Sequence, residues 1–176
     1  MKKDAIVAEI RRQFDEWRLK WMPDLRVHTS CFYHAVFAAS YLKENHPGWI
    51  GRVLISGGSA SFQRVRPEMD DGVIGTHFSY VFEPRSADTL LRLCRDSMPE
   101  MHVWVQLPDR REILDLTTCY LKKQCIETAG LPWLNDDPPD YFWGTPEELP
   151  FGWRYTAQPE ASVVVAHFYK KTWGGA

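Results

Sequence analysis

The sequence has no long apolar run, and this absence argues against several classes of protein. No stretch approaches the ~18 consecutive apolar residues that a transmembrane helix needs. The N-terminal segment MKKDAIVAEIRRQFDEW carries charges throughout and contains no apolar h-region, so it does not resemble a secretory signal peptide. These features predict a cytoplasmic protein with no membrane partner.

Runs of one charge and closely paired cysteines are also missing. The chain has 21 Lys and Arg against 23 Asp and Glu, and no basic stripe indicates a nucleic-acid partner. Cysteines occur only at positions 31, 94, 119 and 125, with no Cys-x-x-Cys pair, so in a reducing compartment we expect free thiols. The glycine-rich segment 56–62, SGGSASF, lacks the lysine of a phosphate-binding loop and predicts a turn.

The chain does have the composition of an ordinary globular protein. Its 176 residues are 44% hydrophobic and show no repeat or linker, which predicts a single domain over 1–176. Apolar residues at helical spacing predict helices over about 3–22, 30–45, 86–97 and 117–130. Alternating segments predict strands over 52–56, 61–66, 77–83, 101–107 and 111–116. The sum is an α+β fold, with N-terminal helices packed on a mainly antiparallel sheet.

The last third of the chain is irregular in pattern. Residues 131–153 are rich in proline and aromatic side chains, which predicts a loop whose aromatic residues pack in the core. The segment 161–169, ASVVVAHFY, is rich in β-branched residues and predicts a final strand. Cys94, Cys119 and Cys125 fall among apolar residues of predicted helices, so core packing accounts for them.

Cys31 stands out because it lies at the start of an apolar helix, in the segment HTSCFYHAVFAA (28–39). Three interpretations are open. Cys31 is a small buried packing residue, a zinc ligand with His28 and His34, or a nucleophile. The spacing places Cys31 and His34 on one helix face, but His28 precedes the expected cap and no fourth ligand stands out. A nucleophile needs a base, and that base needs a partner that fixes its tautomer.

The predicted hairpin 101–116 supplies such a pair. If a two-residue turn at Pro108 and Asp109 closes the hairpin, His102 lies directly opposite Asp115. Opposite residues on one face have Cβ atoms roughly 4.5–5.5 Å apart, within reach of a His–carboxylate hydrogen bond. Trp104 shares that face. A helix N-terminus that brings Cys31 to this face would complete a Cys–His–Asp triad and would favour the thiolate through its dipole.

In these residues the sequence resembles the transglutaminase-like branch of the papain-like cysteine hydrolases. The resemblance covers about residues 28–118: a Cys that begins a helix, the strand His102-Val-Trp-Val, and Asp115-Leu-Thr on the next strand. It implies a papain-like core, with Cys31 as nucleophile, His102 as base and Asp115 as the acid that orients the base. Ser30 and Phe32 stand where many relatives have Gly and Trp, which favours hydrolysis or another acyl transfer over transglutamination.

The resemblance therefore implies a cysteine-dependent hydrolase of a peptide, isopeptide or amide bond, acting through an acyl-enzyme on Cys31. It implies no metal and no organic cofactor, and its partner would be a peptide, protein or small amide substrate. Trp104, His77 and Ser30 are candidate substrate-binding residues, and His77 is a weaker rival base. Acyl-CoA transfer of the arylamine N-acetyltransferase type is the enzymatic alternative. A non-catalytic binding or scaffold domain on the same fold is the other.

Overall fold

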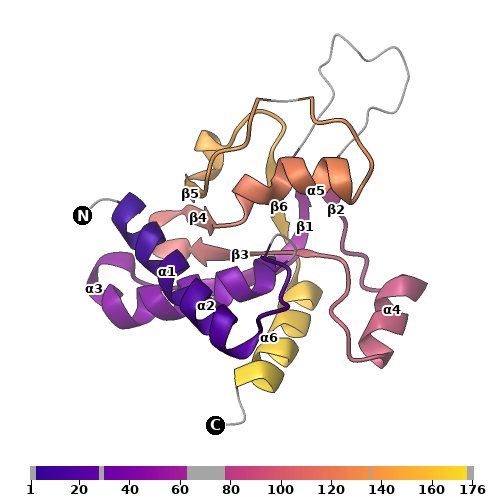
Figure 1. Ribbon diagram of the computed structural model, residues 1–176, viewed down its shortest axis with the longest axis horizontal. Coiled ribbons are helices and arrows are strands. Elements are labelled where there is room, and N and C mark those ends of the chain that lie inside the picture. Colours follow the sequence, from indigo (N-terminus) through magenta and orange to yellow (C-terminus); the bar gives the residue numbers. More distant parts are fainter. Residues whose placement is uncertain (1–2, 28–29, 63–77, 135, 174–176) are drawn as a thin grey trace.

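The computed structural model describes residues 3–27, 30–62, 78–134 and 136–173. The fold is α+β, with six helices and a mainly antiparallel open sheet (Figure 1). The helices are α1 Lys3–Trp21, α2 Cys31–Asn45, α3 Pro47–Ile50, α4 Ala87–Cys94, α5 Leu121–Glu127 and α6 Pro159–Trp173. The strands are β1 Leu54–Ser61, β2 Ser79–Tyr80, β3 His102–Leu107, β4 Glu112–Asp115, β5 Phe142–Gly144 and β6 Arg154–Ala157.

The predicted helices near the N-terminus are confirmed almost to the residue. On α1 the buried side chains Ile6, Val7, Ile10 and Phe14 recur at helical spacing and form one face against α2. α2 begins directly after Ser30, but Ser30 does not cap it, because its hydroxyl donates to the Val27 carbonyl at 2.6 Å. α4 begins as expected, with the Ser86 side chain accepting from the Thr89 N–H.

β1 pairs with three other strands, and every strand pair among the described residues is antiparallel. β3 pairs with β1 over Leu54–Gly58 and with β4 on its other edge, and β4 pairs with β5. Ala60 of β1 pairs with Tyr80 of β2 and also with Tyr155 of β6. Because one residue has only two neighbouring strands, Tyr80 and Tyr155 lie on opposite edges of β1.

The turn predicted over 56–62 is wrong, because the chain continues through it as the middle of β1. The glycines mark places where other segments approach the backbone closely. A Cβ on Gly57 would lie 2.9 Å from a methyl carbon of Val165 on α6. A Cβ on Gly58 would lie 2.1 Å from the Thr156 carbonyl oxygen of β6. Gly in a strand often signals such close approach rather than a turn. The second strand predicted here, 61–66, lies mostly outside the described residues.

The final predicted strand is also wrong, since the segment 161–169 is part of helix α6. Its buried residues are Ala161, Val164, Val165 and Phe168, which follow the i, i+3, i+4, i+7 spacing of a helix. The β-branched composition suggested a strand, but burial of this face against β1 outweighs that preference. β5 lies in the region 131–153 that was expected to be irregular, and β6 follows directly after that region.

Two hydrophobic cores lie on opposite faces of the sheet. α1, α2 and α6 cover one face, and α5 covers the other (Figure 1). Along β3, Val103, Val105 and Leu107 belong to the core under α2, whereas Trp104 belongs to the core under α5. The second core takes in part of the aromatic cluster, with Phe142 and Trp153 buried, as the sequence predicts.

Some predicted features differ at the surface. Cys125 is buried, as expected, but Cys94 is exposed and is not a core residue. Phe151 of the aromatic cluster is exposed as well. None of the helices in the described ranges combines the length and apolar character that a membrane span requires.

Candidate active site

The β3–β4 hairpin brings His102 and Asp115 together, in a register that differs from the predicted one. Val105 pairs with Leu114 rather than with Glu112, because the connection is a longer 3₁₀ turn over Pro108–Arg110. The shift is by two residues, and an even shift leaves every side chain on its predicted face. His102 and Asp115 are therefore diagonal neighbours, and His102 Nε2 lies 2.7 Å from Asp115 Oδ2.

Asp115 is held by four hydrogen bonds that together satisfy both carboxylate oxygens. The Thr117 backbone N–H and hydroxyl donate to Oδ1 at 2.8 and 2.7 Å, an arrangement in which an Asp side chain closes a local turn. Tyr155 Oη donates to Oδ2 at 2.7 Å, the same oxygen that binds His102. With an exposed fraction of 2%, Asp115 is fixed in position and cannot exchange its partners for water.

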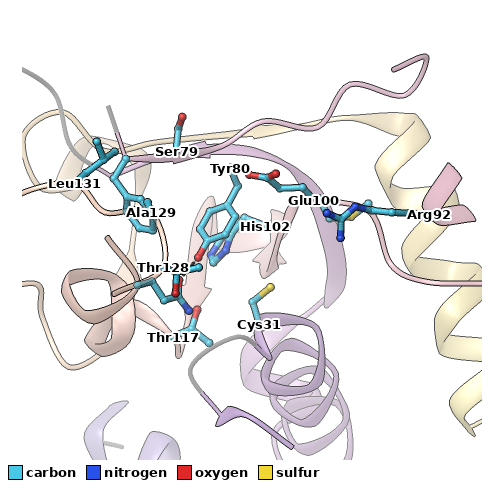
Figure 2. Close-up of a pocket in the computed structure, with 13 residues that line it drawn as sticks. Cys31, Ser79, Tyr80, Arg92, Glu100, His102, Thr117, Thr128, Ala129 and Leu131 are labelled. Carbon is cyan, nitrogen blue, oxygen red and sulfur yellow. Dashed lines mark hydrogen bonds between the residues drawn. The ribbon is translucent and has the colours of Figure 1, made fainter. Parts of the chain in front are cut away.

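Cys31 reaches this pair from the other layer of the fold. It is the first residue of α2, and His102 is the first residue of β3, along which α2 packs. Both side chains line one cavity of about 490 Å³ at the end of the sheet. Figure 2 shows Cys31 projecting from the first turn of α2 into this cavity, below His102 and Tyr80. The first N–H groups of α2 have no partners within the helix and favour negative charge there.

The charges of the pair are strongly coupled. Burial of the His102 ring acts to lower its pKa, but the charge and hydrogen bond of Asp115 and the interaction with Cys31 outweigh burial and raise it. Burial acts to raise the pKa of Asp115, yet His102 and Thr117 outweigh it and lower the value. At neutral pH the pair is therefore an imidazolium and a carboxylate.

The second nitrogen of His102 is free for chemistry. Nε2 is bonded to Asp115, whereas Nδ1 is buried with no hydrogen bond of ordinary geometry to any described residue. Cys31 lines the same cavity as His102 and is among the groups that raise the pKa of the ring. One ring nitrogen is thus fixed by a carboxylate, and the other has no partner of ordinary geometry among the described residues.

Aromatic rings lock the orientation of His102. Tyr80 stacks on it with ring centroids 5.1 Å apart and an interplanar angle of 23°. Phe62 packs edge-on at 5.1 Å, and Trp104 and Tyr155 complete the shell at 6.1 and 5.9 Å. The imidazole is thus held by rings on several sides and by one carboxylate, so its position does not depend on bound substrate.

A second cavity meets the first at Cys31. It has a volume of about 420 Å³ and shares Cys31, Tyr80, Glu100 and Met101 with the first. Its other walls come from α2, from the segment after α4 and from α6, among them Phe32, Ser97 and Phe168. The sulfur atom therefore lies between two hollows, and a bound molecule can extend from Cys31 in two directions.

The zinc interpretation finds no support in the described part of the chain. His34 is buried, packs with its ring centroid 4.2 Å from that of Phe14, and has its pKa lowered to about 4 by desolvation. His28 lies outside the described residues. Among those that are described, no three His, Cys, Asp or Glu side chains gather as metal ligands do.

The candidate substrate-binding residues differ in their location relative to the two cavities. Ser30 lines the second cavity, beside Cys31. Trp104 is 1% exposed and lines neither cavity, so its expected contact with substrate is not found, and it instead supports His102 from within the core. His77 lies outside the described residues.

The residues of the site that sequence reasoning missed include Tyr80, which stacks on His102, as well as Tyr155 and Gln124. Tyr155, which holds Asp115, lies on a strand that the sequence did not predict. Gln124 lies in the predicted helix but carries no sequence signal for a site. Comparison with protein-family models, with curated proteins and with solved structures finds no match for this chain. Its function is therefore argued from the geometry above.

Proposed function

We propose that this protein is a cysteine-dependent acyl-transfer enzyme that hydrolyses a peptide, isopeptide or amide bond through an acyl-enzyme on Cys31. The observation that carries the proposal is the buried His102–Asp115 pair, whose unbonded nitrogen shares a cavity with a cysteine at a helix N-terminus. A packing cysteine needs neither a buried ion pair nor a cavity beside it. This arrangement also fits the resemblance to the transglutaminase-like cysteine hydrolases.

In the reactive form of the site the Cys31 proton lies on His102 Nδ1, so the ring is an imidazolium and the sulfur is a thiolate. The sulfur attacks the carbonyl carbon, and the carbonyl π electrons move onto oxygen to give a tetrahedral oxyanion. As this intermediate collapses, the carbon–nitrogen bond breaks and the departing amine takes the proton from His102. Water then attacks the thioester while His102 accepts its proton, and the acid product leaves as the thiol is restored. Asp115 stabilises the imidazolium throughout.

The two cavities favour hydrolysis of an extended substrate over transfer of a small acetyl group. A chain with groups on both sides of its scissile carbonyl fills both hollows that meet at Cys31. An acetyl group occupies only a small part of either one. An acyl-CoA transferase is not expected to hydrolyse extended peptide substrates. A non-catalytic domain is expected to have a Cys31 thiol no more reactive than the other cysteines.

The test is alkylation of the four cysteines with iodoacetamide at pH 6, followed by peptide mass mapping. We expect Cys31 to react first, because the positive charge of His102 and the N-terminus of α2 both stabilise negative charge that develops on its sulfur. His102→Ala removes the charge partner and slows this labelling markedly. Asp115→Asn slows it less, because the imidazole remains.

Cys94 is the internal control in the same samples. It is exposed and lines neither cavity, so we expect its labelling rate to stay unchanged in both variants. Equal labelling of Cys31 and Cys94, or no effect of His102→Ala on Cys31, identifies a non-catalytic cysteine and overturns the proposal.

A further inference from the structure

The side-chain amide of Gln124 is buried, and only its oxygen has a hydrogen bond to a described residue. It lies on α5, is 6% exposed, and lines the same cavity as Cys31 and His102. Its Oε1 accepts a hydrogen bond from the Tyr80 hydroxyl. Its Nε2 has no hydrogen bond to any residue in the described ranges. An amide nitrogen donates through two N–H groups, so one that belongs to a cavity-lining residue and lacks such a partner is available to a bound ligand.

Tyr80 fixes which end of the amide is available. Burial and the nearby charge of Cys31 both raise the pKa of Tyr80, so the phenol stays protonated and acts as a donor. Since its one proton goes to Gln124 Oε1, the amide is oriented with its two N–H groups directed elsewhere. Tyr80 is itself held by the stacked His102 ring, which ties the amide to the catalytic pair.

The other polar groups of the cavity are already used or solvated. The Thr117 hydroxyl donates to Asp115. Arg92 is paired with Asp88 at 2.7 Å. Thr128, the residue directly after α5, is exposed, and its hydroxyl has water as a competing partner. Gln124 therefore has the buried side-chain donor best suited to a ligand atom in this cavity.

The acyl transfer described above creates a need for such a donor. When the Cys31 sulfur attacks, the carbonyl oxygen becomes an oxyanion, and it needs hydrogen-bond donors already in place. The backbone N–H of Cys31, in the first turn of α2, is one such donor. α5 borders the cavity opposite this turn, as Thr128 and Cys31 show in Figure 2. A carbonyl bound at the Cys31 sulfur would therefore lie in a cavity that Gln124 also lines.

We propose that Gln124 Nε2 is the second oxyanion donor of this site and that Tyr80 is the positioning residue that orients it. No bond to Gln124 forms or breaks. As the carbonyl π electrons move onto oxygen, an amide N–H strengthens its hydrogen bond to the developing charge, and the bond relaxes when the thioester forms. The inference rests on the proposed acyl transfer and adds to it a named residue.

The experiment compares two reagents that attack the same thiol. Acylation of Cys31 by p-nitrophenyl acetate passes through a tetrahedral oxyanion, whereas alkylation by iodoacetamide does not. We expect Gln124→Met to slow acylation by about 100-fold, within the range found when one oxyanion donor is removed. Alkylation of Cys31 in the same variant stays within a factor of about two of the unmodified protein, because the His102–Asp115 pair is intact.

Tyr80→Phe keeps the ring that stacks on His102 and removes only the hydroxyl. We expect a smaller loss of acylation with unchanged alkylation, because the amide is still present but free to rotate. If Tyr80 acts through Gln124, the double variant acylates no more slowly than Gln124→Met alone. A merely structural role for Tyr80 moves both reactions together.

The matched control is Gln106→Met. Gln106 also accepts a hydroxyl hydrogen bond on its Oε1, from Ser56 at 2.9 Å, but it lies outside both cavities. We expect neither reaction to change.

If acylation survives Gln124→Met, or if both reactions fall equally, Gln124 is not the donor. If Gln124→Met does not fold, the test is the ratio of the acylation rate to the alkylation rate in Tyr80→Phe: a lowered ratio supports the proposal, and an unchanged ratio contradicts it. Loss of His102-dependent alkylation in the unmodified protein is a different failure and counts against the acyl-transfer proposal itself.

Discussion

Removing one hydroxyl tests how Asp115 is held. Tyr155 Oη and His102 Nε2 bind the same carboxylate oxygen, each at 2.7 Å, and Asp115 is buried. Burial and the charge of Asp115 raise the pKa of Tyr155 far above its usual range, so the phenol remains a donor at every working pH. Tyr155→Phe therefore deletes one hydrogen bond to a charged acceptor while the ring keeps its packing.

The structure sets the size of the effect. Hydrogen bonds to charged groups contribute about 1.5–3 kcal/mol, so we expect urea unfolding of Tyr155→Phe at pH 7 to show a loss in this range. The carboxylate, with one donor fewer, concentrates more negative charge on His102, so the His102 pKa rises further. Titration of the His102 ring nitrogens by NMR measures this shift directly.

The matched control is Tyr141→Phe. Tyr141 Oη also donates to an aspartate, Asp4, at 2.6 Å, but this bond lies at the exposed surface. We expect its removal to cost under about 1 kcal/mol, since water replaces the lost partner, and to leave the His102 pKa unchanged. Equal losses for the two variants, or a fall in the His102 pKa in Tyr155→Phe, would refute the idea that Tyr155 tunes the pair.

Two further predictions concern the ion pair and the fold. The depressed pKa of Asp115 adds stability that is present above its unfolded value of about 3.9 and is lost as the pH falls through the folded value. The raised pKa of His102 adds stability that is present below its unfolded value of about 6.5 and is lost as the pH rises through the folded value. We therefore expect the free energy of unfolding in urea to be greatest between about pH 3.9 and pH 6.5. The double variant His102→Gln/Asp115→Asn should lack this maximum. On α6, Val165→Asp should lower the urea midpoint of unfolding sharply, because Val165 is buried. Val163→Asp, at a position 71% exposed, should change it little. If the segment were a strand, the two variants would have equal effects or the reverse order.

The sequence by itself determined the elements whose signals are local. The apolar spacing of α1, the boundary at which α2 begins and the alternation of β3 and β4 each depend on residues within a few positions of one another. The His102–Asp115 pair followed from the same alternation. The predicted turn was wrong, but the prediction of the pair was not affected, because a register shift of two residues keeps both side chains on one face.

The tertiary structure decided what depends on segments far apart in the chain. Gly57 and Gly58 form a strand because α6 and β6 pack directly on their backbone, and no neighbouring residue encodes that approach. The valines of α6 become helical for the same reason, since their burial against β1 outweighs their local preference.

The same division runs through the candidate site. The resemblance and the hairpin together predict Cys31, His102 and Asp115 as candidate nucleophile, base and acid, from residues close in the sequence or opposite in one hairpin. The groups around them, Tyr155 at Asp115 and the Tyr80–Gln124 pair beside Cys31, come from strands and helices joined only by the sheet. A hydrogen bond across 40 or 44 positions of sequence leaves no periodic trace, because periodicity records only which face a residue occupies and not what it meets there.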